Sequence, residues 1–113
     1  MSDPVFTFFM TLRSQSNWLA LSRQLRSDYL DASVRPHLAK YAQVKLRFYD
    51  AEAFTGRCTD MAVFETADLR AYYFLIDALR DEAFFGLPYF EVLDIIPAVE
   101  NGYQEYDEEM GVS

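Results

Sequence analysis

The chain has 113 residues, of which 51% are hydrophobic and 17% aromatic, and this content is enough to build the core of one domain. The composition excludes an intrinsically disordered chain, because disordered chains are poor in aromatic residues. The formal net charge of −8 argues against nucleic acid and anionic membranes as partners, because phosphate groups bind clustered Lys and Arg. We expect a single domain over residues 1–113, with a flexible acidic tail from about residue 104.

The chain contains one cysteine, so it forms no internal disulfide and does not depend on an oxidising compartment. No apolar stretch approaches the roughly 20 residues that span a bilayer, and the first residues lack the pattern of a secretory signal peptide. Together these features predict a cytoplasmic protein.

The first expected strand covers residues 5–12, which are rich in aromatic and β-branched residues. The period then becomes helical, and a helix is expected over about 22–33 with Ser22 as its N-cap. Pro36 lacks a backbone N–H and cannot sit inside a helix, so we expect a separate short helix over 36–41 that begins at this proline.

The middle of the chain predicts an antiparallel β-hairpin of residues 44–51 and 57–65, with Gly56 in the turn. Thr66 is then expected to cap a second long helix, which Gly86 and Pro88 end. A fourth strand over 89–96 stops at Pro97.

The resulting order is βαββαβ, which predicts an α+β fold. Right-handed crossovers place both helices on one face of a four-stranded antiparallel sheet, and this is the ferredoxin-like sandwich. The other face should be polar if water covers it. In the expected register it instead mixes apolar and charged residues, namely Thr7, Phe9, Thr11, Lys45, Arg47, Tyr49, Asp60, Ala62, Phe64, Glu91, Leu93 and Ile95. Large exposed apolar patches mark contacts, so we expect a homodimer through this helix-free face.

The polar side chains of that face have two interpretations, and the sequence leaves both open. In the first, Arg47 and Asp60 form a buried ion pair beside Tyr49 that fixes the register of the dimer. In the second, Arg47 holds an anionic or enolate oxygen while Tyr49 or Asp60 moves a proton. Arg47, Tyr49 and Asp60 are therefore catalytic candidates, and Arg13, Arg47, Tyr49 and Glu91 are candidates for ligand binding.

His37 is the only histidine and the remaining catalytic candidate. It is either a general base that titrates near neutrality or a surface or capping histidine, and no neighbouring motif favours catalysis. A single histidine argues against zinc and haem, and the acidic residues around the hairpin turn do not form a compact ligand loop. We expect no metal and no cofactor. The four glycines are isolated, which excludes a glycine-rich phosphate loop.

Four blocks of the chain together resemble the Darcynin family, a group of small bacterial proteins of unassigned function. The blocks are "NWLALS" (17–22), "VRPHLAKY" (34–41), "RFYDAEAF" (47–54) and "TDMAVFET" (59–66), and the likeness extends to about Tyr103. More distantly, the βαββαβ order is similar to that of the dimeric α/β-barrel superfamily, in which two such sheets close into one barrel. That superfamily contains cofactor-free enzymes and non-catalytic proteins, so the fold does not decide between them.

Two functions follow from this resemblance. The first is a homodimeric module that is non-catalytic or binds a small apolar or aromatic ligand. The second is a cofactor-free enzyme, an isomerase, cyclase or monooxygenase, acting on an aromatic or polyketide-like substrate. An enzyme should have an enclosed apolar pocket with a few converging polar groups.

Overall fold

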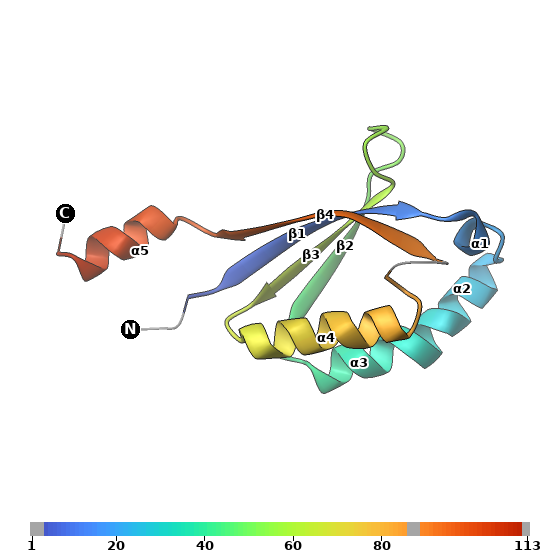
Figure 1. Ribbon diagram of the computed structural model, residues 1–113, viewed down its shortest axis with the longest axis horizontal. Helices are drawn as coiled ribbons and strands as arrows, with labels where there is room; N and C mark the ends of the chain where they lie inside the picture. Colours follow the sequence, from blue (N-terminus) through green and yellow to red (C-terminus); the bar gives the residue numbers. More distant parts are fainter. Residues whose placement is uncertain (1–3, 86–88, 112–113) are drawn as a thin grey trace.

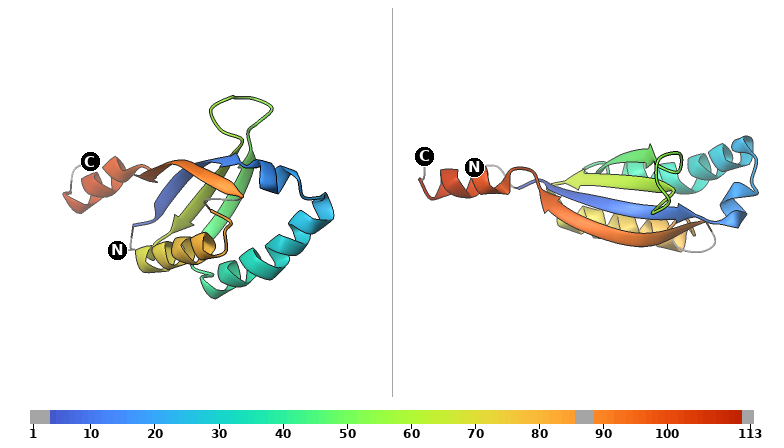
Figure 2. Two further views of the ribbon diagram at one scale, coloured as in Figure 1. Left: turned by 45° about the vertical axis from the view of Figure 1, so that its right-hand side comes forward. Right: turned by 90° about the horizontal axis from the view of Figure 1, so that it is seen from above.

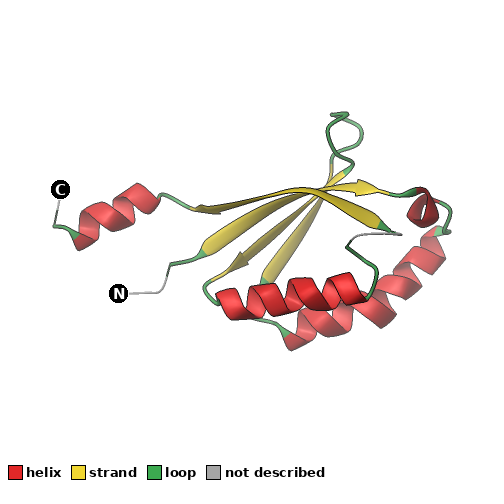
Figure 3. Cartoon of the chain, viewed as in Figure 1, coloured by secondary structure: helices red, strands yellow, loops and turns green. Residues whose placement is uncertain are grey.

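The computed structural model describes residues 4–85 and 89–111, and its centre is a four-stranded antiparallel sheet (Figures 1 and 3). The strands lie in the spatial order β2-β3-β1-β4, which confirms the ferredoxin-like α+β fold. Their bounds are β1 (Phe6–Ser14), β2 (Lys45–Asp50), β3 (Asp60–Thr66) and β4 (Phe90–Val99). The helices are α1 (Ser16–Leu19), α2 (Arg23–Tyr29), η1 (Leu30–Val34), α3 (Arg35–Lys40), α4 (Leu69–Asp81) and α5 (Gly102–Glu109).

The helices that pack on the sheet cover one of its faces. In the right-hand view of Figure 2 the strands lie in front of α4 and of the α2–α3 segment. The loop between β2 and β3 projects away from these helices (Figure 1). Within the described part of the chain, no helix has both the length and the apolar character needed to cross a bilayer.

The first helical segment changes its type in the middle. The Ser22 hydroxyl accepts a hydrogen bond from the backbone N–H of Leu25 at 3.1 Å, which confirms Ser22 as an N-cap. A π-helical turn, η1, then precedes α3, which begins at Arg35 with Pro36 in its first turn. The expected gap between two separate helices is absent, because α2, η1 and α3 follow one another directly from Arg23 to Lys40. The missing N–H of Pro36 is accommodated by the π-helical turn that precedes α3.

The cap of α4 differs from the expectation. The carboxylate of Asp68, and not the hydroxyl of Thr66, accepts the hydrogen bond from the backbone N–H of Ala71, at 3.0 Å. Thr66 ends β3 instead, where its hydroxyl accepts from the N–H of Asp68 and donates to the carbonyl of Gln43. Both side chains can satisfy N–H groups that a helix leaves unpaired, so the sequence alone did not separate them.

The end of α4 and the length of β4 also differ from the expectation. α4 ends at Asp81, and Gly86 and Pro88, which were expected to end it, lie outside the described residues. β4 does not stop at Pro97 but continues to Val99. Proline is tolerated there because β4 is an edge strand, where one side needs no ladder hydrogen bond.

The core lies between the sheet and the helices. Its largest fully buried side chains are Phe64, Met10, Leu12, Leu75 and Leu79. The aromatic residues concentrate at the end of the sheet beside α1 and α2, where the ring centroids of Trp18 and Phe90 are 5.2 Å apart and those of Phe84 and Phe90 are 5.1 Å apart. Many of the aromatic side chains therefore pack inside the domain.

α5 extends from the end of β4 away from the sheet (Figure 1) and buries none of its side chains. The described chain measures 56 × 32 × 19 Å, and its radius of gyration of 16.4 Å exceeds the roughly 13 Å of a compact chain of this length. α5 occupies the part of the chain that was expected to be a flexible acidic tail, and it exposes Tyr103 and Tyr106, as its C-cap exposes Met110.

Candidate functional site

Strand pairing determines the face that each candidate residue occupies, because directly paired residues project to the same side of a sheet. Asp60 pairs with Leu12, which is fully buried beneath the helices. Arg47 pairs with Val63 and projects to the helix-free side. The expected buried pair of Arg47 and Asp60 is therefore wrong, because the two side chains leave the sheet on opposite faces.

The cause is that the side chains of β3 were expected on the wrong faces of the sheet, by a shift of one residue along the strand. Ala62 and Phe64 were expected on the helix-free face, but both have no exposed surface and lie in the core. Met61 and Val63 take their places, opposite Tyr49 and Arg47 of β2. A shift of one residue moves every side chain of a strand to the other face, so Asp60 moved with them.

A β-bulge changes the phase of β4 in the same way. Leu93 has no partner in β1, since the pairing passes from Val92 to Asp94 between consecutive β1 residues. Beyond the bulge, Ile95 lies opposite the fully buried Met10 and not on the helix-free face as expected. Glu91 precedes the bulge and lies on the helix-free face, as predicted.

The helix-free face has three zones. Lys45 and Arg47 are exposed on the edge strand β2, and Glu91 and Asp94 are exposed on the opposite edge strand β4. The two central strands contribute the apolar residues Phe9, Met61 and Val63 to this face, Tyr49 and Ile96 flank them on the edge strands, and Glu65 of β3 lies opposite Lys45. A shallow hollow of about 530 Å³ lies over part of this centre, with Arg47 and Tyr49 among its lining residues. This face thus combines a basic edge, an apolar middle and an acidic edge.

Arg13, a candidate for ligand binding, is engaged within the chain. One terminal nitrogen, Nη2, donates hydrogen bonds to the carbonyl oxygens of Gly56 at 3.3 Å and Arg57 at 2.9 Å. These bonds hold the loop between β2 and β3 against β1. Arg13 pairs with Glu91 on β4, as the expected face requires, but its guanidinium group is directed to the loop.

A second hollow, of about 290 Å³, lies between the helix side of the sheet and the α2–α3 segment, and we call it the helix-side pocket. The sheet contributes one wall and the wide turn η1 with the start of α3 contributes the other. The pocket is lined by Trp18, Leu30, Val34, Arg35, Leu38, Leu46, Phe48, Asp60, Phe84 and Phe90. It is therefore an apolar space with two charged residues, one on each wall.

Asp60 is the polar group on the sheet wall of this pocket. The hydroxyl of Thr59 donates a hydrogen bond to its Oδ2 atom at 2.8 Å. Burial raises the pKa of the Asp60 carboxyl above its ordinary value, the bond from Thr59 opposes this shift, and the charges of Asp50 and Glu52 add to it. The carboxyl group thus holds its proton more strongly than a carboxyl group in water.

His37 lies apart from the other candidates. Its Nε2 atom is 3.2 Å from the Oε1 atom of Glu82, at the end of α4. Tyr29 donates a hydrogen bond to the backbone carbonyl of the same glutamate, and burial is the main reason that the pKa of Tyr29 rises to about 12. These contacts tie α2 and α3 to α4, so the observed surroundings of His37 are those of a residue that joins helices. Its role as a general base stays a prediction.

The family model described as "Darcynin, domain of unknown function" matches residues 1–112. The chain belongs to the Darcynin family. Darcynin 1 of Acinetobacter baumannii is 49% identical to this Darcynin chain over 89 residues, which are 79% of this chain and 99% of the relative. Darcynin of Chromobacterium violaceum is 52% identical over 77 residues, which are 68% of this chain and 98% of that one. The resemblance seen in the sequence is therefore confirmed.

Solved structures with a similar fold include larger proteins that are described as binding or processing other molecules. A heme-binding protein from Thermus thermophilus matches with a TM-score of 0.77 and 14% identity, over 99% of this chain and 46% of that one. A mutant chlorite dismutase from Candidatus Nitrospira defluvii matches with a TM-score of 0.71 and 13% identity, over 88% of this chain and 41% of that one. The Darcynin chain spans less than half of each of these two solved chains, and at such identities the likeness shows the fold alone.

The helix-side pocket does not fit a haem group. Haem iron is held in proteins by His, Cys, Met or Tyr side chains, and none of these is among the described residues that line the pocket. His37 bonds Glu82 and is not a lining residue. Nor do residues 4–85 and 89–111 bring together three or more His, Cys, Asp or Glu side chains that could hold a metal ion.

Sequence reasoning named Asp60 but missed the other residues of the pocket. Arg35, Trp18, Phe48, Phe84 and Phe90 belong to no sequence motif that marks them as a site. The aromatic content of 17% is high for so short a chain, but composition alone does not locate a pocket. The single tryptophan, Trp18, within one of the family-like blocks was a further signal that was available.

Proposed function

We propose that the protein is a homodimeric module that binds a small apolar or aromatic molecule. The observation that carries the proposal is the helix-side pocket, whose walls are mostly aromatic and aliphatic with one polar residue on each side. Small-molecule sites combine such walls with a few polar groups that orient the ligand. Its volume of about 290 Å³ is at the small end of the range for ligand pockets, which suits a ligand of one or two rings.

Phe48 supports the presence of a ligand in this pocket. It pairs with the fully buried Ala62 and therefore projects to the helix side of the sheet, yet 44% of its side chain is exposed. An aromatic ring on the core side of a sheet is normally covered. A bound apolar molecule would cover Phe48 and complete the core at this end of the sheet.

The pocket is tested by titrating ¹⁵N-labelled protein with p-cresol and following amide chemical shifts. We expect saturable shifts in the residues that line the pocket. Leu46→Phe fills part of the pocket and should weaken this binding about tenfold or more, since a buried ring then occupies the space of the ligand. Phe54→Leu, in an exposed loop position, is the matched control and should bind as the unchanged protein does. The absence of saturable shifts would contradict the pocket as a binding site.

A second copy of the chain is the partner proposed for the helix-free face. Phe9 and Ile96 expose 37% and 54% of their side chains there, and the basic and acidic edges are complementary to each other. A twofold axis parallel to the strands places β2 of one protomer over β4 of its partner, so that Arg47, level with Phe9 of β1, lies two residues along the strands from Asp94, level with Thr11. An axis across the strands would stack β2 on β2 and β4 on β4, and like charges would then meet. The charges therefore favour the first arrangement.

Charge reversal tests this arrangement in sedimentation velocity measurements at micromolar protein concentration. Replacing both basic residues, Lys45→Glu with Arg47→Glu, should weaken the dimer about tenfold or more, because the attraction to Asp94 of the opposite edge is then replaced by repulsion. Adding Glu91→Lys and Asp94→Lys to the same chain should restore association. A 13.2 kDa species alone in the unchanged protein would contradict the homodimer. Unchanged association of the β2 variant would contradict the β2-over-β4 arrangement.

A cofactor-free enzyme is the second candidate, and Asp60 is the observation that favours it. A carboxyl group with a raised pKa inside an apolar pocket has the properties of a general acid or base. In this case the reaction would be an isomerisation, cyclisation or oxygenation of an aromatic or polyketide-like substrate, and Asp60→Asn should abolish turnover while ligand binding persists.

The single cysteine, Cys58, is buried and unpaired, which supports the expected cytoplasmic location.

A further inference from the structure

We infer that the ligand of the helix-side pocket is an aromatic carboxylic acid that carries a hydroxyl or N–H donor at its opposite end. The inference rests on the proposed binding function of this pocket and specifies the chemistry of its ligand. Three observations carry it: the free edge of the Arg35 guanidinium group, the position of the Asp60 carboxyl group, and the arrangement of the rings between them.

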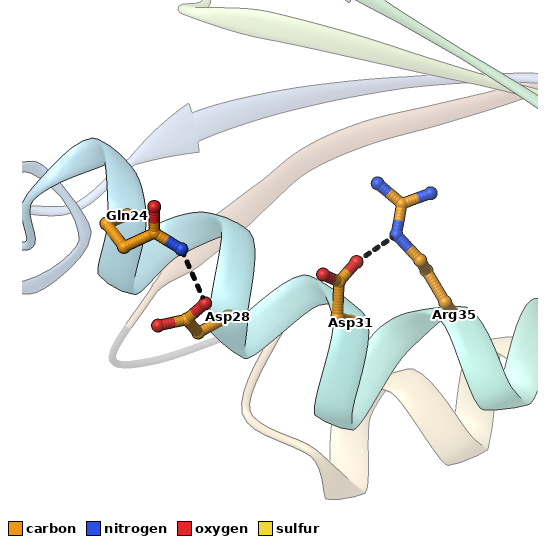
Figure 4. A network of polar contacts seen from close by, with 4 residues as sticks. All are labelled: Gln24, Asp28, Asp31 and Arg35. Atoms are coloured by element: carbon orange, nitrogen blue, oxygen red, sulfur yellow. Dashed lines mark hydrogen bonds and ion pairs between the residues drawn. The ribbon is translucent and has the colours of Figure 1, made fainter.

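Arg35 is oriented by a contact along its own helical segment. Its Nε atom donates a hydrogen bond to the carboxylate of Asp31, one turn earlier (Figure 4). The two terminal nitrogens point away from Asp31 and have no hydrogen-bond partner among the described residues. The side chain is 67% exposed, so it stands at the mouth of the pocket. An arginine whose Nε is already occupied still presents two parallel N–H groups, which match the two oxygens of a carboxylate.

Asp60 presents the opposite chemistry from the sheet wall. Its Oδ2 atom is occupied by the hydroxyl of Thr59, whereas no described residue donates to Oδ1. A fully apolar ligand would exclude water from this atom and leave it without a donor, which costs free energy. A ligand hydroxyl or N–H group would donate to it and would favour the charged carboxylate. The pocket therefore selects a donor at the end of the ligand that faces β3.

The space between these two residues suits a flat ring. The ring of Phe90 lies 5.2 Å from that of Trp18 and 6.0 Å from that of Phe48, at interplanar angles of 53° and 76°. Walls that meet at such angles allow a ligand ring to pack in offset and edge-to-face contacts. The aliphatic residues of the opposite wall, including Leu30 and Leu38, can cover its other face. The body of the ligand is therefore aromatic rather than a sugar or an extended chain.

Three ligands with the same ring separate the contribution of the carboxylate from that of the hydroxyl donor. Each is titrated at pH 7, and binding is followed by calorimetry and by amide chemical shifts. 4-Hydroxyphenylacetate has both polar groups, phenylacetate lacks the donor, and p-cresol lacks the carboxylate. We expect 4-hydroxyphenylacetate to bind about tenfold or more tightly than either of the other two, because each missing group leaves a hydrogen bond to a charged residue unmade.

Two substitutions test whether Arg35 and Asp60 cause the preference for 4-hydroxyphenylacetate. Arg35→Gln should reduce the affinity for 4-hydroxyphenylacetate to that for p-cresol and leave p-cresol binding unchanged. Asp60→Asn should reduce the preference for 4-hydroxyphenylacetate over phenylacetate. Arg23→Gln removes an exposed arginine of α2 that does not line the pocket, so it is the matched control for Arg35→Gln. Thermal unfolding of each variant checks that the fold persists.

The outcomes distinguish the inference from the proposed function. Equal affinities for all three ligands, with saturable shifts in the pocket, would overturn the inference and leave a binding pocket with another selectivity. A preference that persists in both Arg35→Gln and Asp60→Asn would also overturn it. If none of the three ligands binds, the pocket is not a site for aromatic ligands, and the inference fails together with the function on which it rests.

Discussion

The two faces of the sheet use the same four strands for different purposes. On the helix side, Met10, Leu12 and Phe64 are fully buried, and Asp60 is a charged residue at the margin of this surface. On the helix-free side, Phe9 keeps more than a third of its surface exposed between a basic and an acidic edge. The first face is determined by packing within the chain. The second has the charge distribution and the exposed apolar area that a partner would use, so the comparison separates residues that stabilise the fold from residues available for association.

The largest effect expected is the difference between two phenylalanines on adjacent strands. Phe64→Ala should lower the free energy of unfolding by about 3–5 kcal/mol, because it leaves a cavity in the core. Phe9→Ala removes the same atoms from the helix-free face and should cost less than about 1 kcal/mol in the monomer. Urea unfolding, followed by the fluorescence of Trp18 at submicromolar protein concentration, measures both. Similar losses in the two variants would show that the faces do not differ in this way.

A smaller effect, of opposite sign, is expected for Asp60→Asn. Asp60 lies directly opposite Asp50, and like charges in this position destabilise a sheet, so the variant should gain about 0.5 kcal/mol at pH 7. The folded-state pKa of Asp60 is raised above its ordinary value of 3.8. Between these two pKa values the folded chain binds more protons than the unfolded chain, and the contribution of Asp60 to stability therefore falls as the pH rises.

Urea midpoints measured from pH 3.5 to pH 8 test whether the contribution of Asp60 to stability falls as the pH rises. The advantage of Asp60→Asn over the unchanged protein should grow as the pH rises through the raised pKa and then stay constant. Asp94→Asn, which removes an exposed carboxylate of the helix-free face, is the control for the loss of one negative charge. An advantage that is greatest at the acid end would mean that Asp60 is stabilised in its charged form.

The smallest effect is expected for Arg47→Ala. Arg47 is exposed and forms no ion pair with the described residues, so its removal should change the free energy of unfolding of the monomer by about 0.5 kcal/mol at most. The buried ion pair with Asp60, one of the two interpretations of the sequence, would instead make this loss about 3–5 kcal/mol. A loss of that size, measured in urea at submicromolar concentration, would contradict the strand register described above.

Local chemistry was sufficient to predict most elements of the fold. The alternation of apolar and polar residues in β2 gave its faces and the hydroxyl of Ser22 gave a helix start, whereas Pro36 marked a change of helix type and not the separate helix that was expected. Each of these depends on residues that are close in the sequence.

The faces of β3 and β4 could not be predicted in the same way. Residues 61–64 are all apolar because both faces of the sheet are apolar at this strand, and a strand without alternation has no phase in its sequence. The bulge at Leu93 is a property of the pairing with β1 and leaves no local signal. Asp60 was placed on the helix-free face for the first reason, and the candidate site was displaced with it.

The helix-side pocket depends on residues that meet only in the folded chain. Trp18 and Phe90 are far apart in the sequence, and neither is near Asp60, so no motif joins them. Composition does not locate the pocket, because its residues come together only when α1, β2 and β4 are in place. A pocket of this kind is predicted by tertiary packing and not by residue spacing.

The wide turn η1 has a geometric consequence for the wall opposite the sheet. Three aliphatic residues of that wall, Leu30, Val34 and Leu38, are spaced four residues apart. In a regular α-helix each residue advances by about 100°, so a spacing of four drifts by about 40° at each step and the third side chain turns away from the first. A turn that contains more residues reduces this drift and keeps the three side chains in one row along the pocket. The alignment of this row therefore depends on the π-helical turn that precedes Pro36. The pyrrolidine ring of Pro36, which leaves this residue without a backbone N–H, thus affects the shape of the pocket several residues away.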